Sequence, residues 1–395
     1  MRRAVSSSLA FWLVAVAFAV TMIGTTLPTP LYVYYQRELG FSNLTSTVVF
    51  AAYAVGVLAA LLLLGRLSDV IGRRNALLPG LASAMLSAVV FLFADNLALL
   101  LVGRMLSGIS AGIFTGTATA ALFDLADAER RERATVVATV ANMGGLGAGP
   151  LLAGLLAQFS QAPLQLPFEI HLGMLALVSI GVWRMPETVP AQGRPGFTIA
   201  RLRLPPEVRG TFARAALAGF AGFAVLGLFT AVAPAFLRRL LHVSAPAWSG
   251  GIVFTVFSAS ALGQIILVGR LRERALSVGC AILTSGAVLL AVALARGSLV
   301  LLVLAAIVVG GGQGTSFRAG LVAVNAAAPP RQRAEVASLF VLVLYLALSV
   351  PVVGVGLAAD AYGLRVAGIA CALVVATLAS IALVLISRRR SPSSG

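Results

Sequence analysis

The feature that most constrains this chain is a series of long apolar segments that carry almost no charge. Residues 47–64 and 76–94, for example, contain no charged side chain. A run of about 20 apolar residues is long enough to cross a lipid bilayer as a helix. The pattern recurs along the chain, and it predicts twelve membrane-spanning helices at 9–35, 44–64, 76–94, 97–122, 135–158, 163–184, 212–237, 247–268, 275–295, 298–323, 336–358 and 363–386. We therefore expect an all-α polytopic membrane protein.

The charged residues are few, and they are distributed unevenly. Only 11% of the 395 residues are charged, whereas a soluble domain carries about 25%. The formal net charge is +16 and every basic residue except the two histidines is an arginine. A soluble protein this basic would suggest a nucleic-acid partner. Here most arginines fall in alternate loops, as the positive-inside rule predicts, so we expect the lipid bilayer as partner and no nucleic acid. Both termini then lie on the cytoplasmic side of a bacterial cytoplasmic membrane.

The composition also limits the chemistry. Because the chain has no lysine, it has no Walker A motif for ATP. It contains no HExxH motif and no acidic metal-binding cluster in its loops, so we expect no catalytic site, no metal site and no cofactor, and a polytopic enzyme or scaffold is the remote alternative. Cys280 and Cys371 lie in apolar segments, as small core residues do. Any energy input comes from an ion gradient, with protons favoured, or from the gradient of the substrate itself.

Residues 186–211 differ from every other connection. They hold five prolines and several arginines and contain no apolar run, which is typical of a linker. We expect a cytoplasmic linker there, between an N-terminal six-helix bundle (1–185) and a C-terminal one (212–395), in a protein that acts as a monomer. The halves repeat two features: a Gly-Arg-Leu sequence follows the second span (65–67) and the eighth (269–271), and a pair of glycines four residues apart occurs in the fourth and tenth spans. Duplicated halves are typical of secondary transporters.

The loop at 65–74, Gly-Arg-Leu-Ser-Asp-Val-Ile-Gly-Arg-Arg, resembles the signature loop of the major facilitator superfamily. The matching positions are Gly65, Leu67, Ser68, Asp69, Gly72, Arg73 and Arg74. Val70 departs from the pattern, because a basic residue is usual there. Glycines permit a tight turn, an aspartate gains energy at a helix N-terminus, and Arg73 can pair with Asp124 at the end of the fourth span. The resemblance implies a small-molecule transporter with two pseudo-symmetric six-helix bundles, in which this cluster closes a cytoplasmic gate.

Two further motifs lie in the fourth and fifth spans. Arg104 is embedded in an apolar helix, where a charge is costly unless it faces protein or water, and with Gly108 and Gly112 it resembles a family motif linked to proton coupling. The fifth span carries small residues at four-residue spacing, which allow close helix packing, together with a proline. This set resembles the motif of the 12-helix drug:proton antiporters, although Ala153 stands where the strongest form has glycine. It consists of Gly145, Gly149, Pro150 and Gly154, and Asn142 precedes it in the same span.

The remaining polar residues of the spans are candidates for the transport pathway. A polar stripe at helical spacing in the first span predicts a cavity-lining face, or threonines that bond to their own backbone. Ionisable groups inside membranes are functional candidates, and Glu169 and His171 are the candidates for proton coupling. The cavity candidates are Thr21, Thr25, Thr29, Tyr32, Asn142, Gln264, Gln313 and Arg318.

Together these features favour proton-coupled export of amphipathic, drug-like compounds. The motif around Pro150 favours export, as does a pathway with few charged groups. The alternative is proton-coupled uptake or facilitated transport of a sugar or an organic acid, and the sequence does not identify the substrate.

Overall fold

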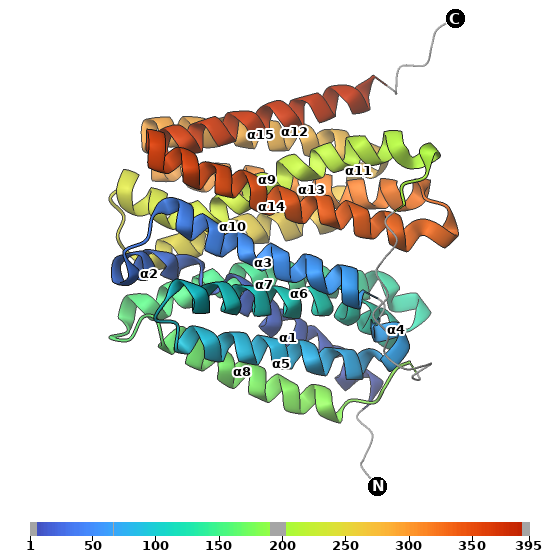
Figure 1. The fold of residues 1–395 in the computed structure, drawn as a ribbon. Helices are drawn as coiled ribbons and strands as arrows, with labels where there is room; N and C mark the ends of the chain where they lie inside the picture. The colour runs from blue at the N-terminus through green and yellow to red at the C-terminus, as the bar shows by residue number, and fades with distance from the viewer. Residues whose placement is uncertain (1–5, 66, 190–202, 389–395) are drawn as a thin grey trace, which may run out of the picture. The chain divides into compact units, whose positions relative to one another are not determined.

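The computed structural model describes residues 6–65, 67–189 and 203–388, and every regular element in them is helical. The α-helices are α1 (Ser7–Thr26), α2 (Tyr32–Leu39), α3 (Asn43–Leu64), α4 (Leu67–Ile71), α5 (Arg73–Leu92), α6 (Leu97–Leu125), α7 (Arg131–Phe159), α8 (Leu166–Arg184), α9 (Arg209–Leu240), α10 (Pro246–Leu262), α11 (Val268–Leu271), α12 (Ala275–Arg296), α13 (Leu299–Ala327), α14 (Arg333–Tyr362) and α15 (Leu364–Ser387). Figure 1 shows these helices in chain order.

Eleven helical stretches of the described residues are long and apolar enough to cross a membrane. One of them, Pro246–Arg296, has 51 residues, which is more than twice the length that a single crossing needs. It bends where Arg272 takes a positive φ of 46°, and it therefore supplies two crossings, α10–α11 and α12. The predicted all-α fold with twelve membrane helices is confirmed.

The first crossing contains a break that its prolines explain. α1 ends at Thr26, a 3₁₀ turn follows at Thr29–Leu31, and α2 begins at Tyr32. Proline lacks an amide hydrogen and cannot continue the ladder of an α-helix, so Pro28 and Pro30 fall at this turn. The crossing thus consists of a regular helix, α1, and a second segment, α2, that follows the turn.

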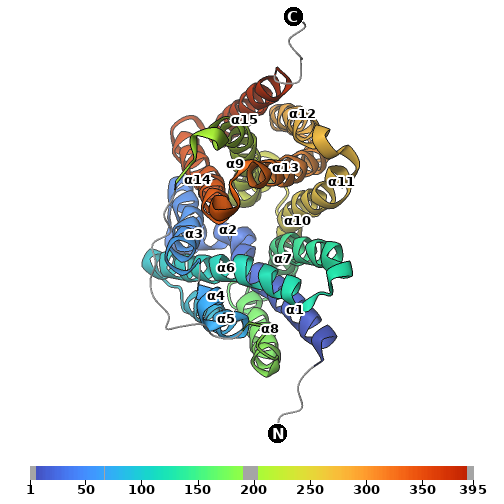
Figure 2. The ribbon, with the colours of Figure 1, turned by 90° about the vertical axis from the view of Figure 1, so that its right-hand side faces the viewer.

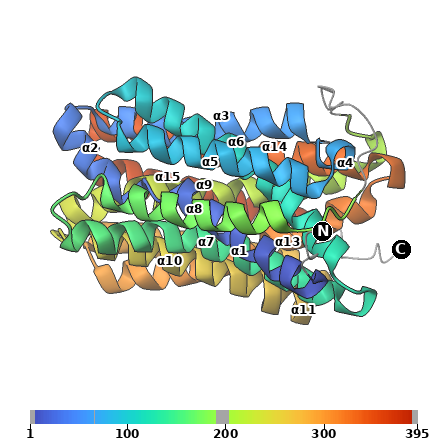
Figure 3. The same ribbon diagram turned by 90° about the horizontal axis from the view of Figure 1, so that it is seen from below.

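The helices pack as two units. The first contains the described residues of 1–40, 52–200 and 245–250, and the second contains those of 41–51, 201–244 and 251–395. In the first unit α1 packs against α6, α7 and α8, and α5 packs against α6 and α8; Figure 3 shows these long helices side by side. In the second unit α9 contacts α13, α14 and α15, and α12 packs between α13 and α15, as the end-on view of Figure 2 shows.

The start of α3 packs with the second unit and the start of α10 with the first. The proposed boundary between two six-helix bundles, with a linker at 186–211, stays a prediction. Residues 190–202 of that linker lie outside the described residues, as do Arg2, Arg3, Arg389 and Arg390 at the termini.

The repeated glycine pairs occupy equivalent helix contacts. A Cβ atom at Gly108 of α6 would collide with the backbone of α3 at Tyr53, and one at Gly310 of α13 would collide with α10 at Val256. The second glycine of each pair, Gly112 or Gly314, meets the same partner helix one turn further along. Small residues of this kind let two helix backbones approach closely in a membrane, so each unit contains the same tight helix pair.

Candidate functional site

Arg73 and two carboxylates form a charged cluster at one end of the first unit. Gly72 has a positive φ of 95° and separates α4 from α5, which begins at Arg73. The Nε atom of Arg73 donates to Asp124 Oδ2 at 2.9 Å, from the last turn of α6. Its Nη1 atom donates to Asp69 Oδ1 and, at 2.7 Å, to Ser68 Oγ. The predicted contact between Arg73 and Asp124 is therefore present, and Asp69 lies in the first turn of its own short helix, α4.

Glu187 completes this end of the unit and is not among the residues predicted from the sequence. Its carboxylate accepts hydrogen bonds from the backbone N–H groups of Arg74 and Asn75, both at 3.2 Å. These groups belong to the first turn of α5, where N–H groups lack partners within the helix. A side chain at Gly72 would collide with the same carboxylate. The available signal was an acid directly after the sixth span, at the same membrane end as the 65–74 loop.

The small residues of α7 form a tight seam with α1. A Cβ atom at Gly145 would lie 2.5 Å from the backbone oxygen of Ala19, and one at Gly149 would collide with that of Ile23. Thr26 Oγ1 donates to Leu146 O at 2.7 Å across the seam, and Pro150 lies inside the helix. Further along α7, Gly154 meets the backbone of Pro246 at the start of α10, in the same unit. Asn142 is half-buried on this helix.

Arg104 lies inside the first unit and is 1% exposed. Its Nη1 atom donates to the backbone oxygen of Thr25 on α1, and the guanidinium carbon lies 4.8 Å from the ring centroid of Tyr53. The hydroxyl of Tyr32 is buried and has no hydrogen-bond partner among the described residues. The arginine therefore links α6 to α1 through a backbone carbonyl.

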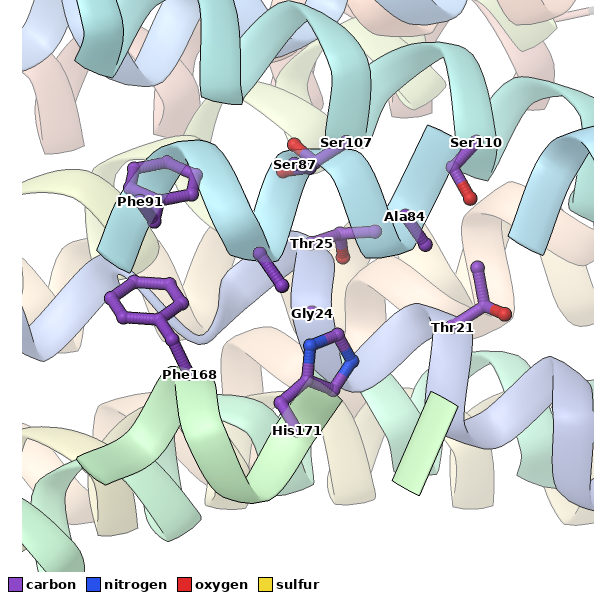
Figure 4. A pocket seen from close by; sticks show the side chains of 11 residues that line it. Thr21, Gly24, Thr25, Ala84, Ser87, Phe91, Ser107, Ser110, Phe168 and His171 are labelled. Carbon is purple, nitrogen blue, oxygen red and sulfur yellow. The ribbon is translucent and has the colours of Figure 1, made fainter. Parts of the chain in front are cut away.

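His171 lines a small cavity between α1, α5, α6 and α8. The other lining residues are Thr21, Gly24, Thr25, Ala84, Ser87, Ala88, Phe91, Ser107, Ser110 and Phe168. The imidazole is 2% exposed, and its Nε2 atom lies 3.0 Å from the backbone oxygen of Val20. Figure 4 shows the ring beside Gly24, with the serines of α5 and α6 across the cavity. The Phe91 and Phe168 rings stack at 4.9 Å at one end of it.

The polar stripe of α1 bonds mainly to its own helix. Thr21 Oγ1 donates to Ala17 O and Thr25 Oγ1 donates to Met22 O, both at 2.8 Å. Thr29 is also buried. Thr21 and Thr25 thus give their hydrogens to the backbone and turn their oxygens toward the small cavity, and a role of the stripe in the transport pathway stays a prediction.

Two predicted glutamines meet in the second unit. Ser260 Oγ donates to Gln313 Oε1 at 2.6 Å, and Gln264 Nε2 donates to Ser260 Oγ at 3.3 Å. Gln264 lies in a π-helical turn, Gly263–Leu267, a local feature that is frequent at functional sites. Arg318 is half-buried further along α13.

Glu169 occupies a different place from the one that the sequence suggests. It belongs to the first turn of α8, and its side chain is exposed. His171, two residues later, points into the unit. The structure thus brings His171 together with Thr21 and Thr25, and it separates Glu169 from this group.

The sequence matches the family model of the Major Facilitator Superfamily over residues 14–350. The chain belongs to this superfamily. It is a multi-pass membrane protein of the transporter fold. The same fold occurs in a bacterial homolog of the human lysosomal transporter Spinster, in its inward-facing, unoccupied conformation, with a TM-score of 0.77, 15% identity and coverage of 98% of this chain and 99% of that one. The human organic anion transporter MFSD10 superposes with a TM-score of 0.69 at 18% identity, over 96% of this chain and 99% of the other.

Sequence relatives in the superfamily match over shorter segments. An uncharacterized transporter of Rickettsia felis is 37% identical over 89 residues, which are 22% of this chain and 21% of the relative. The multidrug resistance protein MdtL of Escherichia coli is 34% identical over 96 residues, 24% of this chain and 25% of the relative. An uncharacterized MFS-type transporter of Methanocaldococcus jannaschii is 26% identical over 158 residues, 40% of this chain and 41% of the relative. The chain thus aligns with about a fifth to two fifths of the length of these relatives.

Proposed function

We propose that this superfamily member is a secondary transporter of the bacterial cytoplasmic membrane that exports small amphipathic molecules in exchange for protons. The observation that carries the proposal is the α7 seam, in which Gly145, Gly149 and Gly154 all meet neighbouring backbone. The same residue set resembles the antiporter motif of the superfamily. The segment shared with a relative named as a multidrug resistance protein supports the same direction of transport.

The transport mechanism is alternating access, in which two helical bundles rock about a substrate site near the bilayer midplane. In this proposal Asp69, Arg73 and Asp124 stabilise the state that is closed to the cytoplasm. The arginine-rich loops and both termini then face the cytoplasm, in keeping with the positive-inside rule. Substrate and proton change the relative stability of the two states only to the extent that each binds one state more tightly than the other.

Proton flux in proteoliposomes tests the proposal directly. Purified protein is reconstituted with a pH-sensitive dye in the lumen, and an imposed pH gradient is challenged with lipophilic cations, antibiotics, sugars and organic acids. We expect an amphipathic compound to trigger proton movement opposite to its own. Proton movement in the same direction as a sugar or an organic acid, or sugar equilibration without proton movement, would instead support uptake or facilitated transport.

A further inference from the structure

The two ring nitrogens of His171 have different surroundings. Nε2 lies 3.0 Å from the backbone oxygen of Val20 on α1. A carbonyl oxygen only accepts hydrogen bonds, so Nε2 carries the hydrogen of the neutral ring and Nδ1 holds a lone pair. Any proton that the ring takes up therefore binds at Nδ1.

The cavity beside His171 offers hydrogen-bond acceptors. Five hydroxyl groups line it, and each donates its hydrogen to a backbone carbonyl: Thr21 to Ala17, Thr25 to Met22, Ser87 to Gly103, Ser107 to Arg104 and Ser110 to Gly80, at 2.7–2.8 Å. A hydroxyl has one hydrogen and two lone pairs, so these oxygens can only accept from the cavity side. The cavity has room for about one water molecule.

We propose that His171 is the proton-binding group of this transporter. A proton from solution binds the Nδ1 lone pair, no other bond breaks, and the ring charge changes from zero to plus one. The new Nδ1–H group donates to the hydroxyl oxygens of the cavity through one water molecule, while Nε2–H keeps its bond to Val20. This assignment rests on the proposed proton coupling, and it gives that coupling a defined atom.

Arg104 is a charged residue that bonds to two residues lining this cavity. Ser107 of α6 donates to the Arg104 backbone, and the guanidinium bonds to Thr25, which itself lines the cavity. α1 has no charged residue, and Glu169 of α8 is exposed. The other charged residues of α5, α6, α7 and α8 lie in the terminal turns away from the cavity: Arg73, Arg74, Asp124, Arg131, Glu132, Arg133 and Arg184.

This arrangement connects the proton to helix movement. His171 and Arg104 bond to two carbonyls of α1, Val20 and Thr25, which are five residues or about 7.5 Å apart along the helix axis. A protonated His171 places a second positive charge against α1, in addition to that of Arg104. The repulsion favours a state in which α1, α6 and α8 move apart, so proton binding changes the relative stability of the two transport states.

The first test measures the ring itself and needs no substrate. The chain has two histidines, so protein labelled with ¹⁵N-histidine in detergent micelles gives two ring systems. The second, His242, is exposed and serves as an internal reference. We expect His171 to be the Nε2–H tautomer at high pH and to gain a proton at Nδ1 as the pH falls from 9 to 3. A ring that stays neutral over this range, or that carries its hydrogen on Nδ1, overturns the proposal.

Two serine variants test the role of the cavity. Ser87 and Ser83 both belong to α5 and both donate to carbonyls of α6, those of Gly103 and Leu106, at 2.8 and 2.9 Å. Of these two serines, Ser87 lines the cavity and Ser83 does not. We expect Ser87→Ala to weaken proton binding at His171 by about two- to tenfold, the value of one hydrogen bond, and Ser83→Ala to leave it unchanged. Equal effects of the two variants overturn the proposed acceptor role.

Transport assays in proteoliposomes then test this assignment independently of the proposed function. The His171→Gln side chain keeps a donor for Val20 but cannot bind the proton. With the compound that triggers proton movement in wild-type vesicles, we expect the variant to lose that movement at least tenfold while exchange of labelled for unlabelled compound continues. Coupled proton movement that survives in the variant overturns the assignment and leaves antiport intact. If no compound moves protons in wild-type vesicles, antiport itself is contradicted, and the ring titration still decides whether His171 binds a proton.

Discussion

Arg73 and His171 are polar side chains of the same helical unit, but their surroundings differ. Arg73 begins α5, its side chain is 12% exposed, and it pairs with the carboxylates of Asp69 and Asp124, which are 62% and 33% exposed. His171 lies within α8, is 2% exposed, and meets a backbone carbonyl and a cavity lined by hydroxyl groups. The two sites therefore differ both in charge and in access to water.

The difference follows from where each site lies along the membrane helices. At a helix end, water screens the ion pairs, so each is worth about 0.2–1 kcal/mol at most, and such pairs can break and form during transport at small cost. Inside the unit, a charge without partners is expensive; the His171 cavity is lined by neutral hydroxyls bonded to backbone carbonyls, and the neighbouring Arg104 is itself bonded to the Thr25 carbonyl. The Arg73 cluster is thus suited to a reversible contact, and the His171 cavity is suited to a group whose charge changes.

The largest expected effect comes from filling the His171 site with one methyl group. A Cβ atom at Gly24 would collide with the imidazole and lie 2.8 Å from its Nε2 atom. We expect Gly24→Ala to displace the ring, to break its bond to Val20 and to destabilise the protein by about 1–3 kcal/mol, as overpacking of a core does. Thermal unfolding in detergent micelles measures this effect.

Gly173→Ala on α8 is the matched control, because a Cβ atom there meets nothing within 4 Å. Alanine favours a helix over glycine by up to about 1 kcal/mol, so this variant should be neutral or slightly stabilised. Equal unfolding temperatures for the Gly24 and Gly173 variants would mean that the ring is not held tightly against α1.

An intermediate effect is expected from Asp124→Asn. Asp124 is the less exposed of the two carboxylates and joins α6 to α5 through Arg73. Loss of this pair leaves a largely buried guanidinium with Asp69 alone, and we expect destabilisation of about 1 kcal/mol and slower transport. Unfolding and uptake into vesicles measure the two consequences. Unchanged transport with a lowered stability would restrict the cluster to a structural role.

The sequence predicted the Arg73 cluster but missed most of the His171 cavity, because the cluster leaves a pattern along the chain and the cavity does not. The cluster arises from a contiguous loop whose glycines and charges share one turn, and charges between apolar spans are conspicuous. Arg73 and Asp124 belong to different spans, but both had to lie at the same membrane end. Glu187 satisfied the same condition, yet it stood in a segment assigned to the linker.

The cavity has no comparable pattern along the chain. Ser87, Ser107 and Ser110 are single hydroxyls on two helices, and what brings them beside Thr21, Thr25 and His171 is the packing of α1, α5, α6 and α8. The sequence suggested His171 itself as a proton site, because it is ionisable and embedded. It favoured Glu169 over His171, since only the true start of α8 at Leu166 places that carboxylate in an exposed first turn. The twelve spans were predictable because apolar length is a property of the sequence alone.

The smallest expected effect on stability is that of Asp69→Asn, and it sharpens the comparison most. Asp69 is largely exposed and pairs with Arg73 within one turn, so we expect the free energy of unfolding to change by less than about 0.5 kcal/mol. We nevertheless expect transport to fall, because the proposed closed state depends on this cluster. The difference in transport between the Asp69 variant and wild type should shrink at high salt, which screens exposed pairs. The difference in transport between His171→Gln and wild type should not depend on salt. Asp127→Asn is the control: its pair with Arg130, at 4.0 Å, is exposed on both sides and lies outside the cluster. Normal turnover by the Asp69 variant would show that the cluster does not hold a transport state, and only the cavity would then remain as a place where charge and helix position are linked.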